Sequence, residues 1–411
     1  MKFDAGNIYN ELSPELRLVL LCSSLKRNDN DQDTIDTLID CGINWPMFIH
    51  LVLHHRVYPL VYRYLSTLEH SNVPDKVLAA LYKFKKDNDC KTLQMSAEFV
   101  RILRALEQKE IFAIVMKGFP LAYQLYGDIT LRMSRDLDLL VHPEDVDEAR
   151  RAIESNGYVW KHPLAHTTPA RFKKWMESNK HLVYWHPELE ICIELHWRLD
   201  SWGMDFPLNV VKNNMTSMQM FGQSVNILDK EELLLYLVIH GAVHAWFRVK
   251  WLVDIDLIVR KGDFSWERLF LLADSLSVKS VLNQAIILLR ELLQTSFPKE
   301  IIYLAEKDRA AQALAVMALR FIKDNGLCRK ITLKEKASIL YKHKRYEYSL
   351  HSGWRGRALC ISRCFIPSVN DLELILLSER LYFLYYIISP IRWIYGRTRN
   401  VITNMARGLS W

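Results

Sequence analysis

Residues 111–141 constrain the fold most strongly, because a strand pattern appears there inside an otherwise helical sequence. The stretch "IFAIVMKG" is a short run of apolar and β-branched residues that ends at Gly118, which predicts a buried strand leading into a tight turn. The next stretch, "FPLAYQLYG", predicts a helix of about two turns, with Pro120 near its start and Gly127 at its end. "DLDLLV" at 136–141 predicts a second strand. This order of elements indicates a small sheet.

The rest of the chain has the apolar spacing of helices. Residues 13–26 open with Ser13 as an N-cap and Pro14 at the first helical position, which is typical of a helix start. Further helices are expected over 46–68, 75–108, 144–156, 231–247, 276–293 and 301–323. We therefore predict an α+β protein in which a small mixed-sheet core is embedded in a predominantly helical chain. The expected regions are an N-terminal helical domain at 1–108, the core at 109–228 and a C-terminal helical region with a basic tail at 229–411.

Two acidic motifs have nearly the same letters but lie on different expected elements. In "DLDLLV", Asp136 and Asp138 lie on a predicted strand, so both side chains project from one face about 7 Å apart and can share a divalent ion. In "DIDLIV", Asp254 and Asp256 lie within "WLVDIDLIVRKG", whose Arg-Lys-Gly ending is typical of a helix C-terminus. Residues two apart on a helix diverge by about 200° around its axis. We therefore expect Asp136 and Asp138 to be the functional pair.

A third carboxylate is expected from the block "HLVYWHPELEICIELHWRL" at 181–199. This block predicts two strands around a Pro187-Glu188 turn. In the second strand aliphatic residues alternate with polar ones, so Glu194 and His196 share the polar face. Glu194 is the only acidic residue on that face. Because hard divalent ions such as Mg²⁺ prefer oxygen ligands, Glu194 on an adjacent strand would complete a metal site.

Together these motifs resemble the nucleotidyltransferase superfold of polymerase beta type. The longer pattern "VMKGFPLAYQLYG", "LRMSRDLDLLVHPED", "IELHW" and "HGAVHAWFRVKWLVDID" is similar to the uncharacterised bacterial nucleotidyltransferase family called NTP_transf_5, over residues from about 45 to 260. The resemblance implies a nucleotidyltransferase core. It also implies Mg²⁺, or Mn²⁺ in its place, as cofactor and a nucleoside triphosphate as substrate.

The resemblance assigns roles to particular residues. The metal ligands and catalytic residues that it implies are Asp136, Asp138 and Glu194. It also implies that Lys117 and Gly118 form the turn that approaches the triphosphate. The superfold usually has a second small residue after this glycine, whereas Phe119 follows Gly118 here. Further contacts with the nucleotide are expected from the side chains of Lys117, Arg132, Ser134, Arg135 and His196.

The expected reaction moves a nucleoside monophosphate from a nucleoside triphosphate to a hydroxyl of a small molecule or a protein, and it releases pyrophosphate. The alternative is a non-catalytic protein of the same fold that acts as a binding or regulatory partner. The three carboxylates favour the enzyme, whereas Phe119 after the glycine favours the alternative. No motif indicates the preferred base or the acceptor.

Several of these residues also have structural interpretations. Lys117 can serve only to solvate its turn, and His196 can form hydrogen bonds within the core. Arg132 or Arg135 can pair with the aspartates of the first motif in an inert ion-pair cluster. These alternatives stay open on the sequence alone.

The helix expected at 231–247 and the residues just after it contain two histidines and three aromatic residues that could have a role. His240 and His244 have the spacing of a helical zinc pair, but they lack the glutamate of H-E-x-x-H, so we expect packing or substrate contact instead. Tyr236, Trp246 and Trp251 are expected in the core rather than in a base-stacking platform.

Composition and charge indicate where in the cell the protein is expected. The seven cysteines include no C-x-x-C pair and the N-terminus lacks the apolar stretch of a signal peptide, so a cytoplasmic protein is expected. Residues 321–411 carry 16 Lys/Arg against 6 Asp/Glu, so positive charge is concentrated in the tail. A solvated helical face explains such a tail, and the alternative is peripheral contact with an anionic membrane surface or with nucleic acid. The apolar stretches "LELILLS" and "LYFLYYIIS" fall short of the ~20 residues of a membrane-spanning helix.

Overall fold

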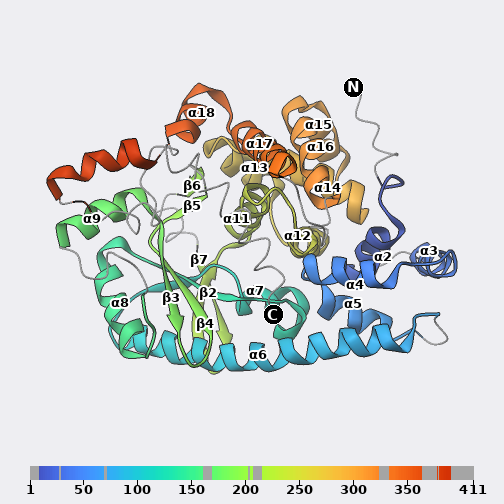
Figure 1. Ribbon diagram of the computed structural model, residues 1–411, viewed down its shortest axis with the longest axis horizontal. Coiled ribbons are helices and arrows are strands. Elements are labelled where there is room, and N and C mark those ends of the chain that lie inside the picture. The colour runs from blue at the N-terminus through green and yellow to red at the C-terminus, as the bar shows by residue number, and fades with distance from the viewer. Residues whose placement is uncertain are drawn as a thin grey trace.

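The computed structural model describes residues 9–26, 29–68, 72–160, 169–201, 204–206, 215–323, 333–362, 377 and 379–389. Figure 1 shows a twisted sheet with the long helix α6 (Asp75–Glu107) along the base of the view and the C-terminal helices along the top. The α+β prediction is confirmed, because one mixed sheet lies within a largely helical chain. The domain boundaries expected at 108 and 228 stay predictions.

The helices before the sheet are α2 (Pro14–Ser23), α3 (Asp29–Asp40), α4 (Trp45–His54), α5 (Tyr58–Leu65) and α6. Helices α2 and α6 begin where the sequence predicts them, the stretch expected over 46–68 is divided into α4 and α5, and α3 was not predicted. The side chain of Ser13 accepts a hydrogen bond from the backbone N–H of Leu16, so it caps α2 as expected. Asn44 caps α4 in the same way through the N–H of Met47.

The main sheet has the strand order β3-β4-β2-β1-β8-β7. Its strands are β1 (Ala113–Val115), β2 (Asp136–Val141), β3 (His181–His186), β4 (Ile191–His196), β7 (Met215–Met220) and β8 (Gln223–Leu228), and a separate pair is formed by β5 (Leu199–Ser201) and β6 (Met204–Phe206). The central strand β2 is antiparallel to β1 and parallel to β4, whereas β4 is antiparallel to β3. The strands predicted at 136–141 and within 181–199 are therefore confirmed as neighbours.

The two faces of the sheet belong to different parts of the core. On β2, Leu137, Leu139 and Val141 are buried in a cluster that includes residues of α6 and of α8 (Val146–Ser155). Leu140 instead belongs to a cluster that joins the N-terminal helices to the helices after the sheet. Because side chains alternate along a strand, Asp136 and Asp138 project to the same side as Leu140.

The segment between β1 and β2 has the predicted short helix, α7 (Phe119–Tyr126). Gly118 at its N-cap has a φ of +82°, and Gly127 at its C-cap has a φ of +69°. Glycine adopts both conformations without the steric cost that another residue meets. Short 3₁₀ segments follow at η1 (Ile129–Leu131) and, after β2, at η2 (Pro143–Asp145).

The hairpin of β7 and β8 was missed by the sequence analysis. Its two-residue loop, Phe221-Gly222, has φ values of 52° and 76°, as a type I′ turn requires. Val225 and Ile227 are buried in alternation with more exposed residues, which is the signal that a strand prediction could have used. The hairpin matters because β8 pairs parallel to β1 and extends the sheet.

The helices after the sheet form the upper part of Figure 1. They are α11 (Lys230–Val243), α12 (Val249–Lys261), α13 (Trp266–Ser275), α14 (Lys279–Leu293), α15 (Lys299–Lys307), α16 (Arg309–Lys323), α17 (Leu333–Leu350), α18 (Gly353–Ser362) and the 3₁₀ segment η4 (Glu379–Leu384). One more helix, α9 (Pro169–Ser178), lies before β3 in the chain. In the described part of the chain, no helix combines the length and the apolar character that crossing a membrane requires. The tail beyond residue 389 lies outside the described residues, as does the stretch "LELILLS" apart from Leu377.

Candidate active site

The parallel pairing of β2 and β4 brings the predicted carboxylates together. In this register Asp138 lies opposite Glu194, and Asp136 lies opposite Cys192. Ligand atoms of Asp138, Glu194 and His196 lie within 4.8 Å of one another, and the predicted ligand Asp136 does not join this group. His196 Nε2 is 3.2 Å from Glu194 Oε2 and 3.6 Å from Asp138 Oδ1. A metal ion could therefore be held at this point on the sheet.

Asp138 has the strongest reason to bind a cation. Its side chain is 1% exposed, so both carboxylate oxygens are removed from water. A buried carboxylate is stable only with positive charge or hydrogen-bond donors beside it. The nearest charge is the Lys117 ammonium, whose Nζ lies 2.9 Å from Asp138 Oδ2 and 3.7 Å from Asp136 Oδ2. Lys117 therefore does more than solvate its turn.

Charges around the cluster keep its carboxylates ionised. Burial by itself would raise the pKa of Asp138, but the charge of Lys117 and the imidazole of His196 hold that pKa below its ordinary value. Burial likewise opposes ionisation of Glu194, yet His196 and His181 lower its pKa to about 2. Burial disfavours the charged form of Lys117, but the two aspartates raise its pKa above the usual value. Ionised carboxylates are the form that coordinates a hard cation.

These residues line a cavity of about 410 Å³. The predicted residues that line it are Lys117, Gly118, Arg132, Ser134, Asp136, Asp138, Glu194 and His196. Arg135 is exposed and does not line the cavity, so the structure does not bring it to the other predicted residues. The reason is its position next to Asp136, since successive side chains point in opposite directions along extended backbone.

The family assignment agrees with this geometry. The model of the family described as uncharacterised nucleotidyltransferase, NTP_transf_5, matches residues 42–294. The chain belongs to this nucleotidyltransferase family. The matched region contains every residue that lines the cavity, from Arg56 to Trp251. No curated protein and no solved structure matches the chain.

The second acidic motif of this family member is structural. It lies on α12, as predicted, and its two carboxylates diverge. Asp254 Oδ2 is 3.0 Å from the buried Arg132 Nε, and the Tyr126 hydroxyl donates to Asp254 Oδ1 at 2.7 Å. Arg132 thus pairs with Asp254 and not with the aspartates of the first motif. On the other side of the helix, Asp256 Oδ1 is 2.7 Å from Arg260 Nε and accepts from the Thr295 hydroxyl at 2.6 Å.

Another acidic group has a structural partner as well. Asp229, Glu231 and Glu232 at the start of α11 lie close enough to hold a metal ion, but Arg268 forms an ion pair with each of them. The three carboxylates therefore already share one cation of the protein.

Further cations line the cavity, and the sequence analysis assigned no role to them. Arg56, Arg248 and Lys250 come from the helical regions, and Lys180 and Arg198 lie beside strands β3 and β4. Arg248, the N-cap residue of α12, packs over the Phe247 ring at 4.9 Å, and burial lowers its pKa to about 10. Lys250 is buried and donates to the carbonyl of Met133 at 3.0 Å, and burial followed by the charge of Arg132 places its pKa well below the ordinary value. The motif "FRVKW" holds the only local signal for these two residues, because it alternates cations with apolar residues.

The turn between α11 and α12 positions this part of the cavity wall. Ala245 and Trp246 have φ values of 51° and 55°, a left-handed conformation that residues other than glycine rarely adopt. A Cβ at Gly241 would lie 2.4 Å from the ring of Trp246, so the turn requires glycine there. Trp246 is fully buried, which confirms its expected place in the core.

The histidines of α11 line the cavity, in agreement with the expected packing or substrate contact. The His244 ring stacks on Trp251 with centroids 5.2 Å apart, and the His240 ring meets Trp251 edge-on at 5.5 Å. Burial lowers the pKa of His244 to about 4, so it is neutral at physiological pH. Among the described residues, neither histidine joins a group of three potential metal ligands. Tyr236 and Trp251 are buried as predicted, but both also form part of the cavity wall.

Proposed function

We propose that this protein is a magnesium-dependent enzyme that transfers a nucleoside monophosphate from a nucleoside triphosphate to a hydroxyl of a small molecule or a protein. The single observation that carries the proposal is the cluster of Asp138, Glu194 and His196, whose ligand atoms lie within 4.8 Å of one another in a cavity lined by cations. Two ionised carboxylates this close together repel each other, and a divalent cation between them would offset that repulsion. Family membership supports the reaction class.

The chemistry of the donor set fits Mg²⁺, or Mn²⁺ in its place. Asp136, Asp138 and Glu194 offer oxygen ligands from adjacent strands, and no cysteine lines the cavity. Magnesium held there would lower the pKa of the acceptor hydroxyl and offset the charge that develops on the phosphates. Lys117 would stay beside the same carboxylates and balance their excess negative charge.

The proposed transfer is balanced in atoms and electrons. The acceptor oxygen forms a bond to the α-phosphorus, the bond from that phosphorus to the bridging oxygen breaks, and pyrophosphate leaves with the electron pair. The hydroxyl proton needs an ionised acceptor, and Glu194, which is ionised at neutral pH and lies beside His196, could take it once the metal has lowered the pKa of the hydroxyl. If Glu194 serves as a metal ligand instead, the proton goes to solvent.

The triphosphate would bind between the turn at Gly118 and the cations of the helices. The N-terminus of α7 begins at this turn, and helix N-termini favour anions. Arg248, Lys250 and Ser134 line the same cavity as this turn. Phe119 does not obstruct this path, because its buried ring packs against Phe99 at 5.6 Å and does not line the cavity. The residue that favoured a non-catalytic protein thus leaves the turn accessible.

Labelled nucleotides test the proposal directly. The protein is incubated with each of ATP, GTP, CTP and UTP carrying the label in either the α- or the γ-phosphate, together with Mg²⁺ and an extract that supplies acceptors. We expect a labelled product from one or more α-labelled nucleotides and none from the γ-labelled ones. Mg²⁺-dependent binding of nucleotide without any labelled product would instead support the non-catalytic alternative.

A further inference from the structure

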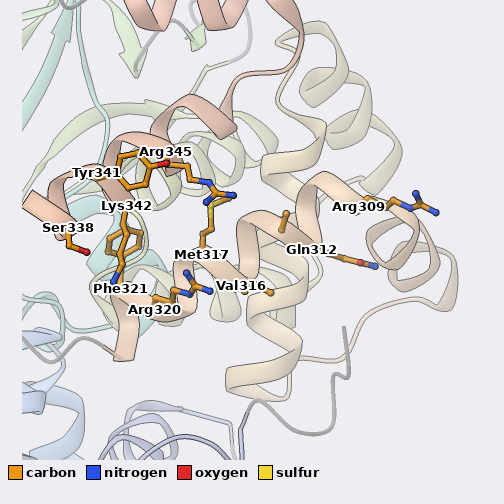
Figure 2. Close-up of a pocket in the computed structure, with 11 residues that line it drawn as sticks. Arg309, Gln312, Val316, Met317, Arg320, Phe321, Ser338, Tyr341, Lys342 and Arg345 are labelled. Carbon is orange, nitrogen blue, oxygen red and sulfur yellow. The ribbon is translucent and has the colours of Figure 1, made fainter. Parts of the chain in front are cut away.

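A groove between α16 and α17 has no role in the proposed reaction. It has a volume of about 940 Å³. Figure 2 shows Tyr341 and Arg345 of α17 facing Met317 and Arg320 of α16. The groove lies outside residues 42–294 that match the family model, so it is separate from the region that defines the family.

The floor of the groove is apolar and follows helical spacing. On α16 it is formed by Ala313, Val316, Met317 and Phe321, spaced at three or four residues along one face. The lining residues of α16 run from Arg309 to Phe321, which at 1.5 Å per residue corresponds to about 18 Å. The opposite face of α16 is buried in the core, whereas Ala313 and Val316 are exposed in the groove and Met317 and Phe321 are partly buried.

The rims of the groove are positively charged. Their cations are Arg309 and Arg320 on α16 and Lys342 and Arg345 on α17. None of them forms an ion pair with another residue that the structure describes, and no acidic residue is among the described residues that line the groove. All four cations are exposed, so the rims present a positive surface that acidic side chains of a partner can complement.

We infer that this groove docks an acidic amphipathic helix of about three turns from a partner protein. The apolar stripe of such a helix would cover Val316 and Met317, and its flanking carboxylates would meet Arg320 and Arg345. Two helices that leave a straight apolar groove offer the geometry in which a third helix packs. Acidic side chains on both flanks match the cations on both rims.

Other occupants fit less well. Single-stranded nucleic acid needs a series of exposed rings for its bases, but the groove exposes only the Tyr341 ring, at 67%, while Phe321 packs edge-on against Tyr346 at 5.8 Å. A planar bilayer cannot reach a concave floor. The chain's own residues 390–411 carry four arginines and no acidic residue, so their charge is wrong for these rims.

A designed peptide tests the inference without knowledge of the natural partner. The probe is a fluorescein-labelled peptide of about 18 residues with leucines at helical spacing on one face and glutamates on both flanks. A second probe carries lysines in place of the glutamates. The full-length chain is titrated into each, and binding is followed by fluorescence anisotropy at two salt concentrations.

The matched variants reverse equal numbers of charges. R320E with R345E alters the groove, whereas K83E with K86E alters exposed cations on α6, on the far side of the molecule in Figure 1. We expect the acidic peptide to bind the wild type, binding to weaken with salt, and the groove variant to bind it at least about tenfold less tightly. The α6 variant should bind like the wild type. Val316→Asp should weaken binding as well, because it places a charge on the apolar floor.

Clear results would overturn the inference. No saturable binding of the acidic peptide to the wild type would do so, as would equal weakening in the groove and α6 variants. The inference also fails if the wild type binds a labelled uridine oligonucleotide of about 12 nucleotides and the groove variant no longer binds it but still binds the peptide. It fails likewise if the groove variant still binds the peptide but no longer binds vesicles of phosphatidylcholine and phosphatidylserine. Circular dichroism of each variant shows whether the fold is retained.

Discussion

The motifs "DLDLLV" and "DIDLIV" place the same acidic spacing in two different environments. On β2, Asp136 and Asp138 share one face with Glu194 nearby, and both aspartates lie within 4 Å of the same cation, Lys117. On α12, Asp254 and Asp256 point to different sides, and each has an arginine and a hydroxyl as partners. The carboxylates of the first motif can still coordinate a cation, whereas those of the second motif are already paired with arginines of the protein. Spacing in sequence therefore has chemical meaning only once the secondary structure is known.

Removing a carboxylate from the first motif should have the largest effect on activity. We expect Asp138→Asn to lower nucleotidyl transfer at least about a thousandfold, since it removes a ligand and a charge at the reacting phosphates. The amide fills the same space and Asp136 still balances Lys117, so the melting temperature should change by less than about 5 °C. Wild-type turnover in this variant would remove the first motif from the chemistry.

The second motif should instead govern stability. Asp254→Asn takes the carboxylate from the buried Arg132, and breaking a buried pair on one side costs about 3–5 kcal/mol. Urea unfolding would measure the loss, and Asp138→Asn serves as the matched control. A free energy of unfolding equal to that of the wild type would show that the α12 pair is not the structural element proposed here.

The helix of the second motif still contributes to the cavity, but through cations at its N-terminus. Arg248→Ala should weaken the binding of Mg²⁺-nucleoside triphosphate about tenfold, because a partly desolvated charge beside the phosphates is lost. Arg135→Ala removes an exposed arginine outside the cavity and should leave this affinity unchanged. Equal losses in the two variants, measured by calorimetry, would place the triphosphate elsewhere.

Glu194→Gln separates two roles of the third carboxylate. If Glu194 is a metal ligand, the variant should bind Mg²⁺ more weakly. If Glu194 is the general base, the variant should bind metal and nucleotide normally. Its turnover should then be strongly reduced and depend less on pH. If Glu194→Gln alters neither Mg²⁺ affinity nor rate, the third carboxylate of the site is another residue.

The smallest expected effect is on acid stability in the absence of metal. The pKa of Glu194 is depressed to about 2 from an unfolded value of about 4.3, so its contribution to stability is complete above that value and is lost as the pH falls toward 2. The stability difference between wild type and Glu194→Gln should therefore be constant above about pH 5 and shrink between about pH 4 and 2. A difference that grows on acidification would contradict the depressed pKa.

The sequence predicted the centre of the site but not its outer wall. Strand periodicity placed Asp136 and Asp138 on one face and Glu194 on the polar face of its strand, but the register that sets Asp138 opposite Glu194 is seen only in the structure. The partner of Arg132 could not be predicted, since Asp254 is 122 residues away and meets it only through packing of α12. Arg248 and Lys250 were missed because the alternation in "FRVKW" does not by itself distinguish a cation in a cavity wall from one on a solvated helix.

Calorimetric titration of a non-hydrolysable nucleoside triphosphate, with and without Mg²⁺, tests the central claim most directly. It is carried out on the wild type, Asp138→Asn and Asp256→Asn, the last two being matched changes in the two motifs. We predict Mg²⁺-dependent binding in the wild type and in Asp256→Asn, and its loss in Asp138→Asn. Retention of Mg²⁺-dependent binding in Asp138→Asn together with its loss in Asp256→Asn would contradict the assignment of the metal site to β2.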